Sequence, residues 1–453
     1  GILKKSKFGA DEFFSKIFSL LVTTLFFLLL IFEIFMPLII KLIAPGFGDD
    51  LQKFSLTVDL SRLAFPFVIF ICLTSLAGAY LNTLGKFAAM ALTPVILNLS
   101  LIFCLLFFFN SQDSVLASNF LSATISLAGS IQLIWILVNL KKNNINFKWK
   151  LPTIKEFKAP SSGITKFLNL LFPVMIGNGA YQLNLLIDMI LASTLTDGSI
   201  SYLYYADRIN QLPLGVLGIA LSTALLPLLS KYVKSKNTYK INQTISQSIK
   251  LGIFFSIPAF FGIFFLSDHI IGILFLRGEF NMDDVNLTGS ALSALAFGLP
   301  SFILIKILAV PFFANEDTKT PIKISIVSIS VNLVFNLILI RDFQHVGLAM
   351  ATAISAWANA ILLFYVLSKK FNYRFDKTIF MDFIKIVLSS LIMIVSIILI
   401  MNLGTINFTV KEFSGTNELL VLTAIFFGGI IYFLMSYFLG IRYIDFKKWK
   451  IKN

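Results

Sequence analysis

Charged residues are scarce in this sequence of 453 residues, where only 13% are Asp, Glu, Lys or Arg and 57% are hydrophobic. The mean hydropathy of +0.87 is far above that of soluble domains. Cysteine and histidine are scarcer still, with two of each. Cys72 and Cys104 lie in apolar runs and are expected to be small buried residues, whereas His269 and His345 lie in expected outer loops and are predicted to be solvated. The composition indicates a membrane protein and gives no sign of a cysteine-based metal cluster.

Long apolar runs account for this composition. About 20 predominantly apolar residues are enough to cross a bilayer as a helix. Twelve runs reach spanning length, at about 17–43, 59–82, 87–109, 116–139, 165–195, 200–229, 247–266, 287–313, 321–340, 345–368, 381–402 and 418–440. We therefore predict an all-α polytopic membrane protein with twelve transmembrane helices in this chain.

Basic residues are concentrated in alternate loops. The loops around Asp113, Asp197, Asp283 and Glu418 are acidic or nearly neutral, and the loops between them are rich in Lys and Arg. Basic loops are retained in the cytoplasm, so the alternation predicts that both termini are cytoplasmic. The net charge of +14 is distributed loop by loop, which argues against a nucleic-acid-binding face.

The chain also matches itself with a shift of 234 residues. The matched positions are Asp49 with Asp283, Asp50 with Asp284, Pro66 with Pro300, and Asn98 with Asn332. Such matches are informative because apolar composition alone does not produce them. The shift covers an even number of runs, so both copies have the same orientation, as in transporters built from two parallel-repeat lobes around a central site.

The repeat predicts four segments. These are an incomplete first lobe of four helices at 1–139, a basic cytoplasmic linker at 140–163, a second lobe of six helices at 164–368, and a two-helix appendix with a basic tail at 369–453. Residue 164 shifted back by 234 falls about seventy residues before Gly1, which is room for two more helices. We expect this chain to be an N-terminally truncated form of a protein with fourteen helices.

The run at 200–229 carries an adjacent acid and base, Asp207 and Arg208, together with Pro213 and Pro227. A charge at the centre of a spanning helix costs roughly 2.5–3.5 kcal/mol on insertion scales, so it persists where it faces a polar cavity or a partner. Asp207 and Arg208 do not face each other, because adjacent helix positions point about 100° apart. The segment is therefore predicted to line a polar path through the membrane.

Other residues in apolar runs are candidates for the same path or for its gates. Lys306 lies in mid-run and is expected to line a cavity or to reach a helix C-terminus. Arg62 lies near an outer helix end, where it either contacts substrate or extends to the lipid headgroups. Helix-breaking residues recur in both lobes, as expected of moving gates rather than of a channel. The predicted hinges are Pro66, Pro213, Gly215 and Pro300.

Several motifs occur in a fixed order along the chain. They include YADR at 205–208 and LPLGVLGIA at 212–220, with further matches at 43–47, 65–67, 81–87, 94–98, 274–280 and 317–321. From about residue 13 onwards the chain resembles the MurJ/MviN family of lipid II flippases, part of the superfamily of multidrug, oligosaccharidyl-lipid and polysaccharide exporters. The resemblance implies a fold of six, six and two helices in the bacterial inner membrane. It also implies transport of lipid II, a polyprenyl diphosphate that carries a disaccharide-pentapeptide, for peptidoglycan synthesis.

The resemblance also implies residue roles. Arg208 matches a cavity arginine of the family and is expected to contact the diphosphate, with Asp207 and Gln211 beside it. Other family members often carry an acid where this chain has Gln211. The resemblance places the family's other cavity arginines on its first two helices, which we expect to precede this sequence.

A second group of polar residues resembles a sodium site of the family. Asp188 is an acid within an apolar run, Asn332 and Asn336 share one helix face, and Thr352 lies on the next helix. Their oxygens suit Na⁺, although one family ligand is an acid where this chain has Asn336. The alternative is a set of interhelical hydrogen bonds, which are common for Asn and Thr in membranes. No cofactor other than Na⁺ is implied.

Other functions compete with this one. A polyprenyl-phosphate enzyme would need clustered carboxylates, and the pair Asp283-Asp284 is the best candidate. Its twin at Asp49-Asp50 favours a repeated loop feature instead. No nucleotide-binding loop occurs, so ATP is not expected to power the protein directly. The nearer alternatives are an O-antigen or polysaccharide flippase and a drug/cation antiporter, and a cationic cavity argues against cationic drugs.

Overall fold

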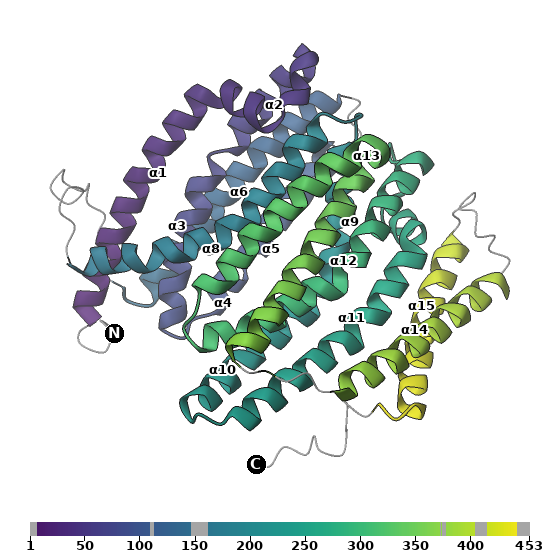
Figure 1. Cartoon of the computed structure of the whole chain (residues 1–453). Helices are drawn as coiled ribbons and strands as arrows, with labels where there is room; N and C mark the ends of the chain where they lie inside the picture. The colour runs from purple at the N-terminus through teal and green to yellow at the C-terminus, as the bar shows by residue number, and fades with distance from the viewer. Residues whose placement is uncertain are drawn as a thin grey trace. The chain divides into compact units, whose positions relative to one another are not determined.

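The computed structural model describes residues 7–108, 113–145, 162–371, 373, 377–403 and 415–441. These residues form helices and turns, with no β-strand among them, which confirms the predicted all-α class. The chain divides into two compact units, Gly1–Met175 and Ile176–Asn453, and helix α8 (Ser162–Ser193) crosses the boundary between them. Figure 1 follows the chain through both units. Most of the predicted linker and the basic tail lie outside the described residues.

The first unit is built on long helices. They are α1 (Lys7–Ile43), the 3₁₀ helix η1 (Pro45–Asp49), α2 (Leu51–Ala64), α3 (Phe67–Thr83), α4 (Ala88–Ala91), α5 (Thr93–Phe108) and α6 (Ser114–Lys142). Its core joins Phe14 of α1, Leu73 and Ala77 of α3, and Ile136 of α6. Many large apolar side chains outside this core are exposed. This pattern is expected of helices whose outer faces contact lipid.

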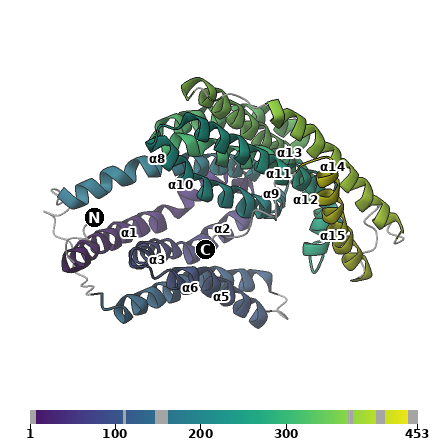
Figure 2. The same ribbon diagram turned by 90° about the horizontal axis from the view of Figure 1, so that it is seen from below.

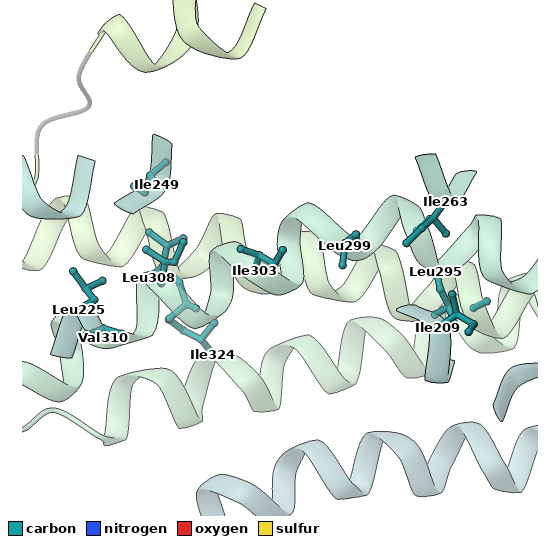
Figure 3. Close-up of a cluster of buried hydrophobic side chains, with 14 of the residues drawn as sticks. Ile209, Leu225, Ile249, Ile263, Leu295, Leu299, Ile303, Leu308, Val310 and Ile324 are labelled. Atoms are coloured by element: carbon teal, nitrogen blue, oxygen red, sulfur yellow. The ribbon is translucent and has the colours of Figure 1, made fainter. Parts of the chain in front are cut away.

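The second unit holds the larger core. Its elements are α9 (Ser199–Pro213), the π-helix η2 (Leu214–Ile219), α10 (Ala220–Lys234), α11 (Thr238–Phe275), α12 (Met282–Ala314), α13 (Lys319–Lys370), α14 (Lys377–Leu403) and α15 (Gly415–Phe438). Helix α12 is the most enclosed, with Leu299 and Ile303 fully buried. Figure 3 shows these two side chains along α12, with Ile249 of α11 on one side and Ile324 of α13 on the other.

The structure places the twelve predicted runs on helical segments, although 59–82 is divided between α2 and α3, 87–109 between α4 and α5, and 200–229 among α9, η2 and α10. Ten helices among the described residues are long and apolar enough to span a membrane. That number is lower because α13 counts once although it contains two runs, and because α8 is represented there only by Gln182–Ser193. Gln344 interrupts α13 with non-helical angles (φ 48°, ψ −128°). Contacts such as the hydrogen bond from Ser328 Oγ to the Ser355 carbonyl show that the two arms pack antiparallel.

The shift of 234 residues also relates helices. It carries α11 onto α1, and α12 onto α2 together with α3. Pro66 lies in the break between α2 and α3, whereas its partner Pro300 is buried within an unbroken α12. The repeated acidic pairs cap helices: the Asp50 carboxylate accepts from the backbone N–H groups of Gln52 and Lys53, and Asp284 belongs to a capping box at the start of α12. Helix capping therefore accounts for one acid of each pair, Asp50 and Asp284.

Helices α14 and α15 pair with each other and pack against α11, as Figures 1 and 2 show from two sides. Lys250 of α11 forms an ion pair with Asp382 of α14, with 3.0 Å between the nitrogen and the oxygen. The Tyr432 hydroxyl of α15 donates to the backbone carbonyl of Phe254. The appendix predicted at 369–453 is thus joined to the second unit by polar contacts as well as by apolar packing.

The prediction for the two histidines was wrong. His269 and His345 are 5% and 3% exposed, although both lie near the helix ends that were expected to be outer loops. His345 Nε2 lies 3.0 Å from the backbone carbonyl of Leu287, and its ring packs against Tyr202. The reason is that neither segment is an exposed loop: His269 lies within α11, shortly after its non-helical residue Leu266, and His345 follows Gln344, where the two arms of α13 meet.

Candidate functional site

Helix α9 presents two different faces. Ala206, Ile209 and Asn210 are buried in the second unit, and Ala206 and Ile209 join its main apolar core. Tyr204 and Arg208, one turn apart, are exposed on the other side. An arginine on an apolar helix is stable where it meets polar groups rather than hydrocarbon. This geometry agrees with a helix whose exposed stripe lines a polar path.

The guanidinium of Arg208 lies over the ring of Tyr204, with its central carbon 4.6 Å from the ring centroid. Helical side chains lean toward the N-terminus, so Arg208 reaches the residue four positions earlier. Asp207 accepts a hydrogen bond from the Gln211 side-chain amide instead of pairing with Arg208. Among the described residues, no acid forms an ion pair with Arg208. Its N–H donors are therefore available to an anion.

The helix changes geometry immediately after Pro213. Residues Leu214–Ile219 form a π-helix, which includes the exposed Gly215. Proline has no backbone N–H, so a regular α-helical hydrogen bond is missing at this point. Helical turns with an extra residue are common at functional sites. Nothing in the structure tests whether Pro213 and Gly215 move, and their hinge role stays a prediction.

The other predicted cations lie elsewhere. Lys306 is exposed on α12, and its Cγ lies beside Gly218 of η2, 3.5 Å from where a Cβ would stand. Arg62 is exposed on α2, near the Glu33 carboxylate of α1 in the first unit. The substrate roles of Lys306 and Arg62 therefore stay predictions.

The four predicted sodium ligands do come together. Asp188 of α8 accepts hydrogen bonds from Asn336 (2.7 Å) and Thr352 (3.0 Å), which lie on opposite arms of α13. The amide of Asn332 donates to Thr352 Oγ1 at 3.2 Å, and Asn336 donates to Asn332 Oδ1 at 2.8 Å. Asn332 and Asn336 are fully buried. One network therefore ties α8 to both arms of α13.

This network also offers a set of oxygens to a cation. The side-chain oxygen Oδ1 of Asn336 is buried without a hydrogen-bond partner, next to the Asp188 carboxylate. Other buried side-chain atoms of the described residues are in the same state, and at Asn336 it leaves one amide oxygen available to a ligand. Carboxylate, amide and hydroxyl oxygens are the donors that hard cations prefer. The residues present fit a small hard cation.

A family model described as "Lipid II flippase MurJ" matches residues 2–439 of this chain. The chain belongs to the lipid II flippase MurJ family. A probable lipid II flippase from Rickettsia prowazekii is 40% identical over 87% of this chain and 76% of its own length. One from Haemophilus influenzae is 37% identical over 76% of this chain and 67% of its own length. The family is one of transporters with multi-pass membrane domains.

Solved structures agree with the family assignment. A lipid II flippase MurJ in an inward closed conformation superimposes with a TM-score of 0.76 at 29% identity, covering 94% of this chain and 83% of the other. An inward-facing multidrug transporter of the wider superfamily gives a TM-score of 0.67 at 17% identity, covering 82% of this chain and 83% of its own. The second likeness concerns the fold alone.

Sequence reasoning about this member of the MurJ family missed two residues. Tyr204 immediately precedes the YADR motif, and its contact with Arg208 was not expected, although their spacing of four is the signal for it. Asn184 lies one turn before Asp188, and its amide nitrogen is 3.5 Å from the Asp188 carboxylate. The same spacing of four could have identified it as a neighbour of the acid.

Proposed function

We propose that this chain carries lipid II from the inner to the outer leaflet of the bacterial cytoplasmic membrane, where it serves peptidoglycan synthesis. The observation that carries the proposal is the family match over residues 2–439. The ten helices of spanning length and composition among the described residues suit a protein that moves a lipid across a bilayer. The alternation of basic and acidic loops supports an orientation with both termini in the cytoplasm.

Arg208 contacts the diphosphate in this proposal. A diphosphate cannot cross hydrocarbon unless fixed groups replace its water, and a guanidinium does so with paired hydrogen bonds while it stays charged. Arg208 is exposed, and its donors have no acid partner among the described residues. Asp207 and Gln211 on α9, and Lys306 on α12 beside Gly218 of η2, are the further head-group contacts of this proposal.

Transport proceeds by alternating access, in which the protein opens to each side of the membrane in turn. The break at Pro66 and the π-helix after Pro213 are the places where a helix bends at least cost, because their regular hydrogen bonding is already interrupted. The polyprenyl tail stays in the lipid while the head group passes along the exposed stripe of α9.

Sodium binds at Asp188, Asn332, Asn336 and Thr352 in this proposal. The unsatisfied Asn336 Oδ1 beside the Asp188 carboxylate supports it. Purified wild-type protein should gain roughly 1.4 kcal/mol of stability when Na⁺ is raised to ten times its dissociation constant. K⁺ at the same ionic strength is the control, and Asp188→Asn should abolish the gain. Equal stabilisation of both proteins by Na⁺ would place the ion elsewhere.

The transport proposal is tested in cells depleted of their own lipid II flippase. Lipid II at the outer surface is labelled in cells that produce this chain as wild type, as Arg208→Ala, or as Arg341→Ala. Arg341 is an exposed arginine on α13 and serves as the matched control. Wild type and Arg341→Ala should restore exposure, whereas Arg208→Ala should not. Absence of lipid II at the surface, despite normal insertion of the wild type, would favour a related exporter of another lipid-linked sugar.

A further inference from the structure

The exposed stripe of α9 contains an aromatic ring to which the transport proposal gives no role. Tyr204 is 55% exposed, and its ring packs edge-on against Tyr205. Tyr205, the next residue, lies instead among Phe275 and Phe280 in the packed unit. Tyr205 therefore has the surroundings expected of an aromatic side chain that serves packing. The ring of Tyr204 has the Arg208 guanidinium over its face instead.

Stacking restricts the arginine in a useful way. A long arginine side chain normally loses considerable rotamer freedom when it binds an anion. A guanidinium held over an aromatic face keeps its plane fixed, while its N–H groups point outward from the edges. Because no acid among the described residues forms an ion pair with Arg208, a guanidinium held over the Tyr204 ring keeps its N–H donors ready for an incoming anion. Binding then costs less ordering entropy.

We propose that Tyr204 is a positioning residue for substrate binding, because it holds the Arg208 guanidinium in the orientation that receives the diphosphate of the lipid-linked substrate. This inference rests on the proposed function and adds to it a residue that acts through Arg208. The aromatic face is the required property, since it alone meets the guanidinium. The hydroxyl of Tyr204 has no part in it.

The chain provides a matched control for this contact. Tyr365 and Lys369 on α13 form the same pair four residues apart, with the Lys369 nitrogen 4.5 Å from the ring centroid. Tyr365 is 51% exposed, close to the 55% of Tyr204. Replacing either tyrosine by leucine keeps a helix-forming side chain and removes an equivalent cation–aromatic contact. Only Tyr204→Leu removes a contact of Arg208, the residue proposed to bind substrate.

The test measures the dissociation constant for lipid II of the purified full chain in lipid nanodiscs. Tyr204→Leu should weaken binding roughly threefold to tenfold, because the freed arginine side chain must then be ordered when the substrate binds. Tyr204→Phe and Tyr365→Leu should stay within about twofold of the wild type, because the first keeps the ring face and the second lies elsewhere. In an Arg208→Ala background, Tyr204→Leu should have no further effect, since its role passes through the arginine.

The outcomes separate the inference from the transport proposal. Wild-type protein that does not bind lipid II overturns the transport proposal itself. Wild-type protein that binds, with Tyr204→Leu binding equally well, overturns the role of Tyr204 and leaves the transport proposal standing. An equal loss from Tyr204→Leu with and without Arg208 would show that the ring acts independently of the arginine, which also contradicts the inference. Thermal unfolding of each variant identifies any that fails to fold.

Discussion

Gly347 lies where the two arms of α13 approach each other closely, so a substitution at Gly347 tests how closely the arms pack. A Cβ at this position would stand 2.5 Å from the backbone oxygen and 2.8 Å from the backbone carbon of Leu339. Ordinary contacts of a Cβ begin at 3.4 Å, so the arms would have to separate by several tenths of an ångström. The obstacle is backbone and not the end of a flexible side chain. Gly347→Ala therefore forces a displacement of the second arm.

Overpacking of this kind costs about 1–3 kcal/mol. Replacing glycine by alanine also stabilises the folded protein by up to ~1 kcal/mol, because alanine favours the helix over the unfolded chain. Gly429→Ala on α15 isolates that second contribution, since a Cβ there meets nothing within 4 Å. We expect Gly347→Ala to unfold about 1–3 kcal/mol more easily than Gly429→Ala, the cost of the clash alone.

The assay is unfolding of the purified protein by sodium dodecyl sulfate, followed by circular dichroism. Thr352 lies on the displaced arm, so Gly347→Ala should also weaken the response to Na⁺. Equal unfolding midpoints for Gly347→Ala and Gly429→Ala would refute the reasoning, because they would show that the arms do not approach each other as closely as the structure places them.

Two further predictions concern ion pairs in the second unit. Lys250 and Asp382 form an ion pair, so the two single substitutions should together cost more stability than the double substitution. In a double-mutant cycle of unfolding free energies, this difference should be roughly 1–3 kcal/mol. Additive losses would mean that the pair does not couple α14 to α11. Burial would raise the pKa of Asp317, but hydrogen bonds from Lys370 and Thr320 outweigh it and hold the pKa below the ordinary value of 3.8. The folded state therefore binds fewer protons, so this stabilisation is present above pH 3.8 and is lost as the pH falls through the folded pKa. Asp317→Asn should flatten that part of the acid unfolding profile, and an unchanged profile would contradict the assignment.

The spanning helices were predictable from the sequence because bilayer thickness fixes the length of an apolar helix. The break near Gln344 was also visible, since apolar runs end before it and resume after it. The internal repeat identified equivalent positions but not their local geometry. Pro66 separates two helices, whereas Pro300 is buried in a continuous one, because each depends on the neighbours that pack around it.

At the candidate sites too, the sequence identifies the residues, whereas their contacts depend on packing. The resemblance to a sodium site of the family groups Asp188, Asn332, Asn336 and Thr352 at the level of sequence, and intramembrane polar residues need partners in any case. The unsatisfied oxygen of Asn336 could not, since it depends on which amide atoms are already bonded. The burial of His345 follows from a contact with Leu287, 58 positions away in the chain, and local polarity gives no sign of it. Sequence patterns thus identified the polar residues, and tertiary packing determined what each of them contacts.

The central claim is that this chain moves lipid II and that Arg208 receives its diphosphate. The most direct measurement reconstitutes the purified protein in vesicles that carry fluorescent lipid II and follows the fraction that becomes accessible to a membrane-impermeant quencher. We predict transfer by the wild type and by Arg341→Ala, and background transfer by Arg208→Ala. Transfer by Arg208→Ala at the wild-type rate, or none by the wild type when correctly inserted, would contradict the account.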